Sequence, residues 1–271
     1  MPALKFKTID SITLHYAHEG QEQTTPLVFI NSLGTDLRIW DAVAARFADR
    51  FMLIRYDKRG HGLSDCPPGP YTIRQHTNDL AGLLEQLQVE AVVLIGVSVG
   101  GMIAMDYAAS YPQRIRALVL SDTAAKIGTT DLWNERISLL RENGMAHLAG
   151  AILERWFSPA FAGQHPAAYR GYFNMLTRTP LEGYIATCEA IRDADLSDVA
   201  PSIEAPTLVV GGAEDGATPP DLVRGLAEAL PNARFELIEH AGHIPSIEQP
   251  AILAAKIDQF LKENGYGRSK V

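Results

Sequence analysis

The 271-residue sequence predicts an α/β protein: a mostly parallel, eight-stranded sheet with helices on both faces and an inserted helical cap. Three observations support this prediction. Short apolar, β-branched runs alternate with amphipathic helical patterns, which is typical of a parallel sheet wrapped by helices. Between residues 124 and 200 the alternation stops and only helical patterns occur. Glycine-rich polar segments follow several strands, at the sheet edge where such folds bind ligands.

The strands are predicted from short apolar runs bounded by turn residues. Residues 4–8 and 12–18 alternate apolar and polar residues, which predicts an antiparallel hairpin at the edge of the sheet. Further runs predict buried strands at 26–30, 51–56, 92–95, 115–120, 206–211 and 235–238. Apolar residues at three- and four-residue spacing predict core helices through Ile39 and Phe47, at 72–87, between Ser98 and Pro112, and at 249–264.

The helical stretch from 124 to 200 separates two sheet strands. A connection of this length is far longer than a usual crossover. We therefore predict one core domain made of residues 1–123 and 201–271, with residues 124–200 inserted as a cap over the C-terminal edge of the sheet.

Composition limits the classes of function. Apolar residues make up 46 % of the chain, which is ample for a sizeable core. A formal charge of −8 without a basic cluster argues against nucleic acid and anionic membranes as partners. Because no apolar run reaches about 18 residues and the first residues lack a signal-peptide pattern, we expect a cytoplasmic protein. Cys66 and Cys188 are expected to be free thiols, and no ligand spacing suggests a metal.

The pentapeptide Gly96-Val97-Ser98-Val99-Gly100 stands between a predicted strand and a predicted helix. A G-x-S-x-G motif at such a turn is the pattern of a nucleophile elbow. Glycines are needed because side chains at 96 and 100 would collide with the neighbouring strand and helix. The serine hydroxyl then stands at a helix start, whose N–H groups attract negative charge. Taken alone, the motif fits an ordinary glycine-rich turn equally well.

A serine hydroxyl needs a base, and the base needs a third group that orients it. Asp215 and His243 each follow a predicted strand, so both reach the same sheet edge as Ser98. Small residues beside both allow tight loops with inward-pointing side chains. Glu214 is the rival for the acid, and His61 could line the site, although a structural role is favoured for it.

The chain carries several motifs in one order: the loop after the third strand, Asp57-x-Arg59-Gly60-x-Gly62-x-Ser64, the elbow, the Asp215 loop and Gly242-His243. In this order and spacing the sequence resembles the α/β-hydrolases over nearly its whole length. The resemblance implies an oxyanion hole formed by the backbone N–H groups of Leu33 and Val99. It also implies that Arg59 is structural and bonds loop carbonyls.

The loop Asn31-Ser32-Leu33-Gly34-Thr35-Asp36, with residues 96–98 and 212–220, is similar to that of 3-oxoadipate enol-lactonases. Most relatives carry His-Gly in place of Asn31-Ser32, but a backbone N–H at 33 does not depend on that side chain. The similarity implies hydrolysis of the enol-lactone to 3-oxoadipate in the β-ketoadipate pathway of aromatic catabolism. It implies an acyl-enzyme on Ser98 and no cofactor.

A small anionic lactone as substrate calls for a cation near the site. Trp133 and Arg136 stand at i and i+3 on the first predicted cap helix, so they would face the same side. Arg178 and Arg192 are other candidates in the cap.

Other enzymes use the same triad, so their activities stay open as alternatives for this chain. These are carboxylesterases, perhydrolases like the cofactor-free haloperoxidases, and C–C bond hydrolases. Dehalogenases and epoxide hydrolases are disfavoured because they carry an aspartate where this chain has Ser98. A non-catalytic, ligand-binding α/β-hydrolase is the alternative from another class, and three intact triad candidates disfavour it. The sequence leaves the oligomeric state open.

Overall fold

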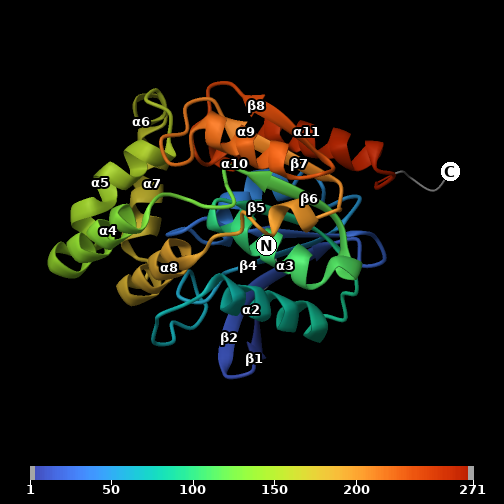
Figure 1. Cartoon of the computed structure of the whole chain (residues 1–271), viewed down its shortest axis with the longest axis horizontal. Helices are drawn as coiled ribbons and strands as arrows, with labels where there is room; N and C mark the ends of the chain where they lie inside the picture. The colour runs from blue at the N-terminus through green and yellow to red at the C-terminus, as the bar shows by residue number, and fades with distance from the viewer. Residues whose placement is uncertain (1–3, 268–271) are drawn as a thin grey trace.

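One sheet of eight strands organises the part of the chain that the computed structural model describes, residues 4–267. The predicted ends of the core at 1–3 and 268–271 lie outside it. The strands are β1 (Lys5–Ile9), β2 (Ile12–Gly20), β3 (Pro26–Ile30), β4 (Met52–Tyr56), β5 (Val92–Val97), β6 (Ile115–Ser121), β7 (Thr207–Gly212) and β8 (Ala233–Ile238). Their spatial order is β1-β2-β4-β3-β5-β6-β7-β8. Figure 1 shows β1 and β2 at one end of the sheet and β7 and β8 at the other.

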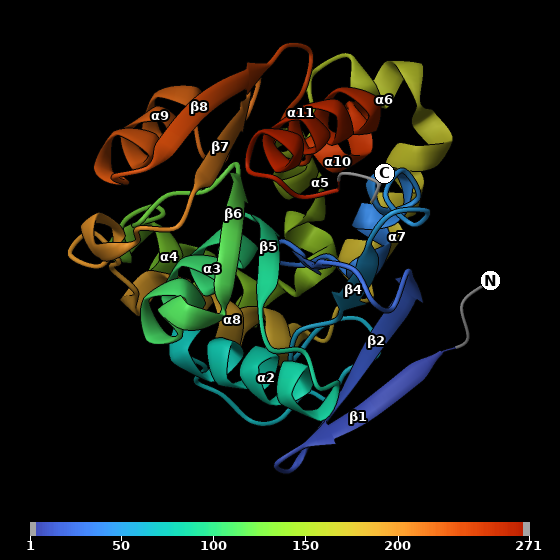
Figure 2. The same cartoon turned by 90° about the vertical axis from the view of Figure 1, so that its right-hand side faces the viewer.

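The sheet is mostly parallel, as predicted. Strand β2 pairs antiparallel with both β1 and β4, and every other neighbouring pair is parallel. Figure 2 shows the β1–β2 hairpin at one edge and β8 at the other. All residues of β3 and β5 are buried, because helices cover both faces of the central strands. Their carboxyl ends deliver residues 31–36 and Ser98 to the same edge.

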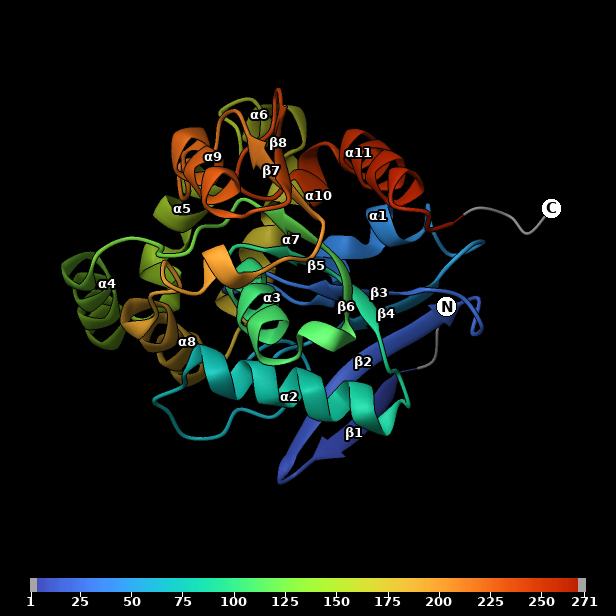
Figure 3. The ribbon, with the colours of Figure 1, turned by 45° about the vertical axis from the view of Figure 1, so that its right-hand side comes forward.

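Helices lie on both faces of the sheet (Figure 3). On one face α2 (Ile73–Gln86) packs against α3 (Val99–Ser110), and on the other α1 (Asp41–Ala44) packs against α11 (Pro250–Glu263). A capping box of Thr72 and Gln75 starts α2 at the predicted place. A single 3-10 turn, η2 (Pro112–Arg114), ends the connection from α3 to β6.

One helical prediction for the core is wrong, and two core helices were not predicted. The helix through Ile39 and Phe47 is only η1 (Leu37–Trp40) followed by the one-turn α1. The predicted helix at 249–264 is confirmed as α11, which begins with Pro250 at its first position. The one-turn helix α10 (Pro245–Glu248) precedes it and was not predicted. Helix α9 (Pro220–Ala229) packs on β7 and β8 and was not predicted.

The connection between β6 and β7 is helical, as predicted. It contains α4 (Thr130–Asn143), α5 (Met145–Trp156), α6 (Phe161–Gln164), α7 (Pro166–Thr177), α8 (Leu181–Asp193) and η3 (Ala200–Ser202). Helices α4 to α8 gather at one end of the molecule in Figure 1. We call residues 124–200 the cap segment, and its division from the core as a domain stays a prediction.

Within residues 4–267, none of the helices is both long and apolar enough to cross a membrane. Cys66 and Cys188 are both free in this part of the chain.

Candidate active site

Ser98 occupies a strained turn between β5 and α3. Its backbone has φ 59° and ψ −124°, a conformation that non-glycine residues rarely adopt. A Cβ at Gly96 would lie 2.3 Å from the carbonyl oxygen of Gly100, and one at Gly100 would lie 2.3 Å from that of Ile30. The two glycines are therefore sterically required, by the helix in one case and by β3 in the other.

Asp215 and His243 form a buried pair. The Nδ1 atom of His243 lies 2.8 Å from Oδ2 of Asp215, and the two residues are 2 % and 5 % exposed. Thr218 donates to the same carboxylate from its hydroxyl, at 2.6 Å, and from its N–H, at 3.0 Å. Burial alone would raise the pKa of Asp215, but His243 and these donors outweigh it and lower that pKa. The carboxylate is therefore held ionised.

The rival acid lies elsewhere. Glu214 is directed to the exposed His240, with Oε1 3.7 Å from Nδ1. The chain therefore brings Asp215, rather than Glu214, to His243. His61 accepts a hydrogen bond at Nε2 from the Gly34 N–H at 3.0 Å, an arrangement that agrees with its favoured structural role.

Ser98 and His243 open onto one cavity. Of the predicted residues, Leu33, Trp133 and Arg136 also line it. The remaining lining residues come mainly from the cap segment and the Asp215 loop: Ile127, Gly128, Leu132, Arg155, Trp156, Tyr184, Ile191, Ala217 and Thr218. Predicted residues from four separate segments thus meet at one place.

Leu33 and Val99 stand beside Ser98 at the ends of β3 and β5. Within residues 4–267, neither backbone N–H donates a hydrogen bond to a protein group. Buried backbone donors nearly always have a partner. Two partnerless N–H groups beside a serine are therefore suited to receive an oxyanion.

Two cap arginines supply positive charge to the cavity. The guanidinium carbon of Arg136 lies 4.9 Å from the centre of the Trp133 ring. Arg155 donates from Nε to the carbonyl of Gly216 at 3.0 Å. Burial, followed by the positive charge of Arg136, lowers the pKa of Arg155. Within residues 4–267 neither arginine forms an ion pair with a carboxylate.

Sequence reasoning missed Arg155, Trp156 and Tyr184 in this lining. No spacing distinguishes Arg155 from the other cap arginines, because docking of the cap helices decides which faces point inward. Of the other arginines considered, Arg178 is exposed and Arg192 binds Asp193 at 2.7 Å.

The expected role of Arg59 needs correction. Its guanidinium binds the carboxylate of Asp79 on α2 at 2.6 Å through both Nε and Nη2. It also lies 5.4 Å from the centre of the Tyr71 ring. Arg59 is therefore structural, as expected, but it bonds a carboxylate rather than loop carbonyls.

This fold and site geometry define a class of protein. Residues 25–250 match the model of the alpha/beta hydrolase fold family, and the chain belongs to that family.

Among known proteins, the chain is 36 % identical to 3-oxoadipate enol-lactonase 2 of Acinetobacter baylyi, over 97 % of this chain and 99 % of the relative. The crystal structure of the enol-lactonase from Burkholderia xenovorans LB400 has a TM-score of 0.93 and 37 % identity, covering 95 % of this chain and all of that one. A thermophilic esterase from Thermogutta terrifontis has a TM-score of 0.90 and 28 % identity, covering 97 % and 99 %.

Proposed function

We propose that the chain hydrolyses 3-oxoadipate enol-lactone to 3-oxoadipate, with Ser98 as nucleophile, His243 as base and Asp215 as the group that orients it. The observation that carries the proposal is the 2.8 Å Asp215–His243 pair beside Ser98, in a cavity that also presents Arg136. The similarity to two enol-lactonases, at 36 % and 37 % identity over almost the whole chain, supports the choice of substrate.

The reaction proceeds in two acyl-transfer halves. His243 takes the proton of Ser98 as the serine oxygen attacks the lactone carbonyl. The N–H groups of Leu33 and Val99 stabilise the oxyanion, and the ring C–O bond then breaks. The ring oxygen leaves as an enolate, whose carbon takes the proton that His243 removed from Ser98, so the enolate becomes the ketone and His243 is neutral again. One water, activated by His243, releases the new carboxylate and restores the serine.

Asp215 has a defined part in both halves. Its carboxylate accepts a hydrogen bond from the Nδ1–H of His243, which leaves Nε2 free to act as the base. An ionised partner also stabilises the imidazolium that forms when the serine loses its proton. The lowered pKa of Asp215 keeps that charge available at neutral pH.

The substrate's free carboxylate is proposed to bind at Arg136, with Trp133 beside it. Arg155 adds a second positive charge to the same cavity. A guanidinium without an ion-pair partner gains a charge-assisted hydrogen bond when an anionic substrate enters. The proposal therefore accounts for two arginines facing an otherwise largely apolar lining.

A general carboxylesterase is the second candidate. The similarity to the thermophilic esterase, at a TM-score of 0.90, favours it. This candidate would use the same triad without selecting an anionic substrate. The expectations of a cytoplasmic location, of no nucleic-acid or membrane partner and of no cofactor stay predictions.

Steady-state kinetics on a small panel test the proposal: the enol-lactone, a neutral lactone, and a neutral and an anionic ester. We expect the highest kcat/KM for the enol-lactone and loss of activity on all four in Ser98→Ala, with the fold retained. Equal preference for the neutral ester would favour the esterase. More than a few per cent of residual activity in Ser98→Ala would exclude Ser98 as nucleophile.

A further inference from the structure

Two carbonyl groups behind the proposed oxyanion donors accept hydrogen bonds from buried side chains. Nζ of Lys58 lies 2.6 Å from the carbonyl oxygen of Ser32, and Oγ1 of Thr123 lies 2.7 Å from that of Ser98. Ser32 precedes Leu33, and Ser98 precedes Val99. Each side chain therefore binds the same peptide group that carries a proposed oxyanion donor.

Because a peptide group is rigid, a hydrogen bond to its carbonyl oxygen also fixes the direction of its N–H. A peptide group is planar and almost always trans, so its C=O and the N–H of the next residue point in opposite directions. A donor that fixes the Ser32 oxygen on one side therefore fixes the Leu33 N–H on the other. The same relation holds between the Ser98 oxygen and the Val99 N–H.

Burying Lys58 here is energetically costly. The residue is 1 % exposed, and within residues 4–267 its ammonium has no carboxylate at ion-pair distance. Taking an unpaired ammonium out of water is strongly unfavourable. Stability alone would thus favour an apolar side chain at 58. We therefore look for a functional role for the Lys58 ammonium at its hydrogen bond to Ser32.

We propose that Lys58 and Thr123 are positioning residues of the oxyanion hole, each holding one peptide plane so that its N–H points at the developing negative charge. The inference rests on the proposed function, since it requires Ser98 as nucleophile and Leu33 and Val99 as donors. Hydrogen bonds in a chain polarise one another, so a donor at the carbonyl also strengthens the N–H as a donor.

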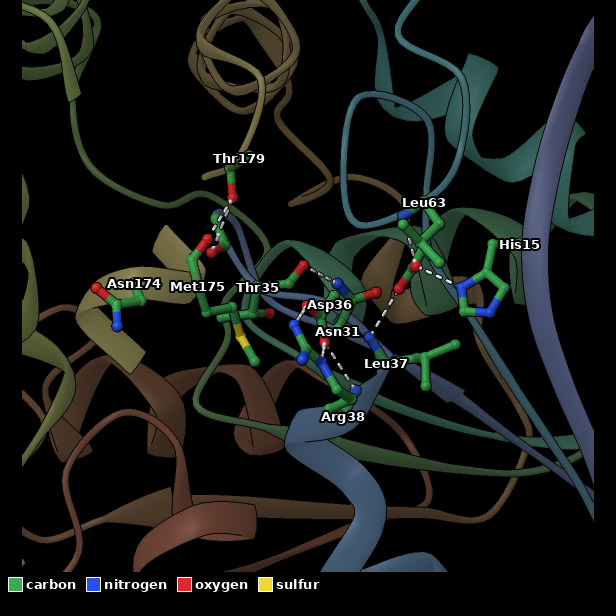
Figure 4. A network of polar contacts seen from close by, with 12 residues as sticks. His15, Asn31, Thr35, Asp36, Leu37, Arg38, Leu63, Asn174, Met175 and Thr179 are labelled. Carbon is green, nitrogen blue, oxygen red and sulfur yellow. Dashed lines mark hydrogen bonds and ion pairs between the residues drawn. The ribbon is translucent and has the colours of Figure 1, made fainter. Parts of the chain in front are cut away.

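Other contacts hold the loop after β3, so losing Lys58 should not unfold it. Asp57 accepts from the Leu37 N–H at 2.8 Å, and the Asn31 side chain donates to the Thr35 carbonyl (Figure 4). The Thr35 hydroxyl also donates to the Ser32 oxygen, at 2.9 Å.

The elbow likewise keeps a second donor. The Ser98 oxygen also accepts from the Gly101 N–H at 2.8 Å. A Thr123→Val variant should therefore fold, with a less well fixed Val99 N–H.

The experiment uses Lys58→Met and Thr123→Val, with Thr123→Ser as the conservative variant. Thr187→Val is the matched control, because the Thr187 hydroxyl is also buried and donates to a backbone carbonyl, that of Gly183 at 2.8 Å, but in the cap. The measurements are kcat and KM on p-nitrophenyl acetate, Ki for a boronic acid that mimics the tetrahedral intermediate, and the melting temperature.

We expect kcat to fall about 10-fold or more in Lys58→Met and Thr123→Val, less than the roughly 10²–10³-fold loss from removing a donor outright. KM should change little, because the effect belongs to the transition state. Ki for the boronic acid should rise in parallel with the loss of kcat. Thr123→Ser and Thr187→Val should retain near-normal kcat. If Lys58→Met and Thr123→Val have a lower melting temperature but unchanged kcat and Ki, the proposal is overturned.

The pH profile gives an independent readout. Burial lowers the pKa of Lys58 to about 7, against the opposing charges of Asp57 and Asp36, while the adjacent His61 and His76 have pKa values well below the usual range and stay neutral. The ammonium is thus present below pH 7 and lost above it. We expect kcat to decline on the alkaline side of pH 7 in the native chain and not in Lys58→Met. An identical alkaline limb in both would contradict the role of Lys58.

Ser98→Ala distinguishes a failure of the proposed function from a failure of the positioning role alone. If that variant still hydrolyses the ester, the proposed function fails and this inference with it. If Ser98→Ala is inactive while Lys58→Met and Thr123→Val behave like the native chain, only the positioning role fails.

Discussion

Arg136 brings a positive charge to a cavity whose other contributors are mostly apolar. If it binds the substrate carboxylate, Arg136→Ala should raise KM for the enol-lactone about 10- to 100-fold, as expected for a hydrogen bond between charged groups. KM for a neutral ester should stay within about twofold, because that substrate has no carboxylate to bind. Steady-state kinetics on the two substrates measure the contrast.

Arg178→Ala is the control for this prediction, since Arg178 is an exposed cap arginine outside the cavity lining. It should leave both KM values unchanged. An unchanged KM for the enol-lactone in Arg136→Ala would show that the carboxylate binds elsewhere, and Arg155→Ala would then be the next variant.

Asp122 is a fully buried carboxyl group beside the proposed triad acid. Its Oδ1 accepts from the Gly212 N–H at 2.7 Å, and its Oδ2 accepts from the Ser121 hydroxyl at 2.6 Å. Burial, followed by the charge of Asp215, raises the pKa of Asp122 well above the usual range. Asp122 is thus the neutral member of the pair and Asp215 the charged one. No motif in the sequence pointed to this role.

The raised pKa of Asp122 predicts a pH-dependent stability. In the unfolded chain an aspartate loses its proton near pH 4, whereas native Asp122 keeps it to higher pH. The native state then binds more protons, so the free energy of unfolding falls as the pH rises above about 4. Asp122→Asn removes this loss, because an amide does not titrate and can still accept from the Gly212 N–H. The melting temperature of the variant minus that of the native chain should therefore be larger at pH 8 than at pH 4.

Asp198→Asn, at an exposed position, provides the reference for that comparison. The melting temperature of Asp198→Asn should differ from that of the native chain by the same amount at both pH values. A melting-temperature difference for Asp122→Asn that is larger at pH 4 would reverse the assigned sign and refute the neutral state of Asp122.

At the scale of elements, α8 approaches the loop after β4 at a contact between two glycines. A Cβ at Gly183 would lie 2.4 Å from the carbonyl oxygen of Gly60. Gly183→Ala should therefore cost about 1–3 kcal/mol of stability through overpacking. It should also raise KM, because α8 carries Tyr184 into the cavity lining. Thermal melts and lactone kinetics test the two expectations.

Gly150→Ala in α5 is the matched control, because a Cβ there meets nothing within 4 Å. Alanine is favoured over glycine in a helix by roughly 1 kcal/mol, so this variant should be at least as stable as the native chain. If Gly183→Ala melts as high as Gly150→Ala, the helix moves away from the loop without cost and the close contact is unimportant.

Strand positions and the residues that follow them could be predicted because each signal is local. The apolar runs, the glycines of the elbow and the capping residue Thr72 act on their immediate neighbours. Helix α9 was missed, although Pro220 at its first position is a favourable start for a helix.

The inner face of the cap could be predicted only in part, at Trp133 and Arg136, because most of it depends on contacts between residues distant in sequence. Arg155 reaches the cavity only because α5 docks against the Gly216 loop. Lys58 and Asp122 act on loops that lie next to them only after the strands have paired. Local patterns contain no signal for such contacts.

At the scale of the whole molecule, the cap segment contacts the loop after β3, the Asp215 loop and the His243 loop. The His243 N–H donates to the Trp156 carbonyl at 2.8 Å, and Ser158 donates to Glu248 at 2.6 Å. The Thr179 hydroxyl lies 3.3 Å from the Gly34 carbonyl oxygen (Figure 4). Cap docking and site geometry are therefore coupled, so variants at this boundary should change kinetics as well as stability.

The proposed function requires Ser98 to be the nucleophile, activated by His243 and Asp215. Labelling with a fluorophosphonate, followed by mass spectrometry of the intact and digested chain, tests this most directly. We predict one adduct per chain, located on Ser98, much slower labelling in His243→Ala, and none in Ser98→Ala. An adduct on another residue, or equal labelling of Ser98→Ala, would contradict it.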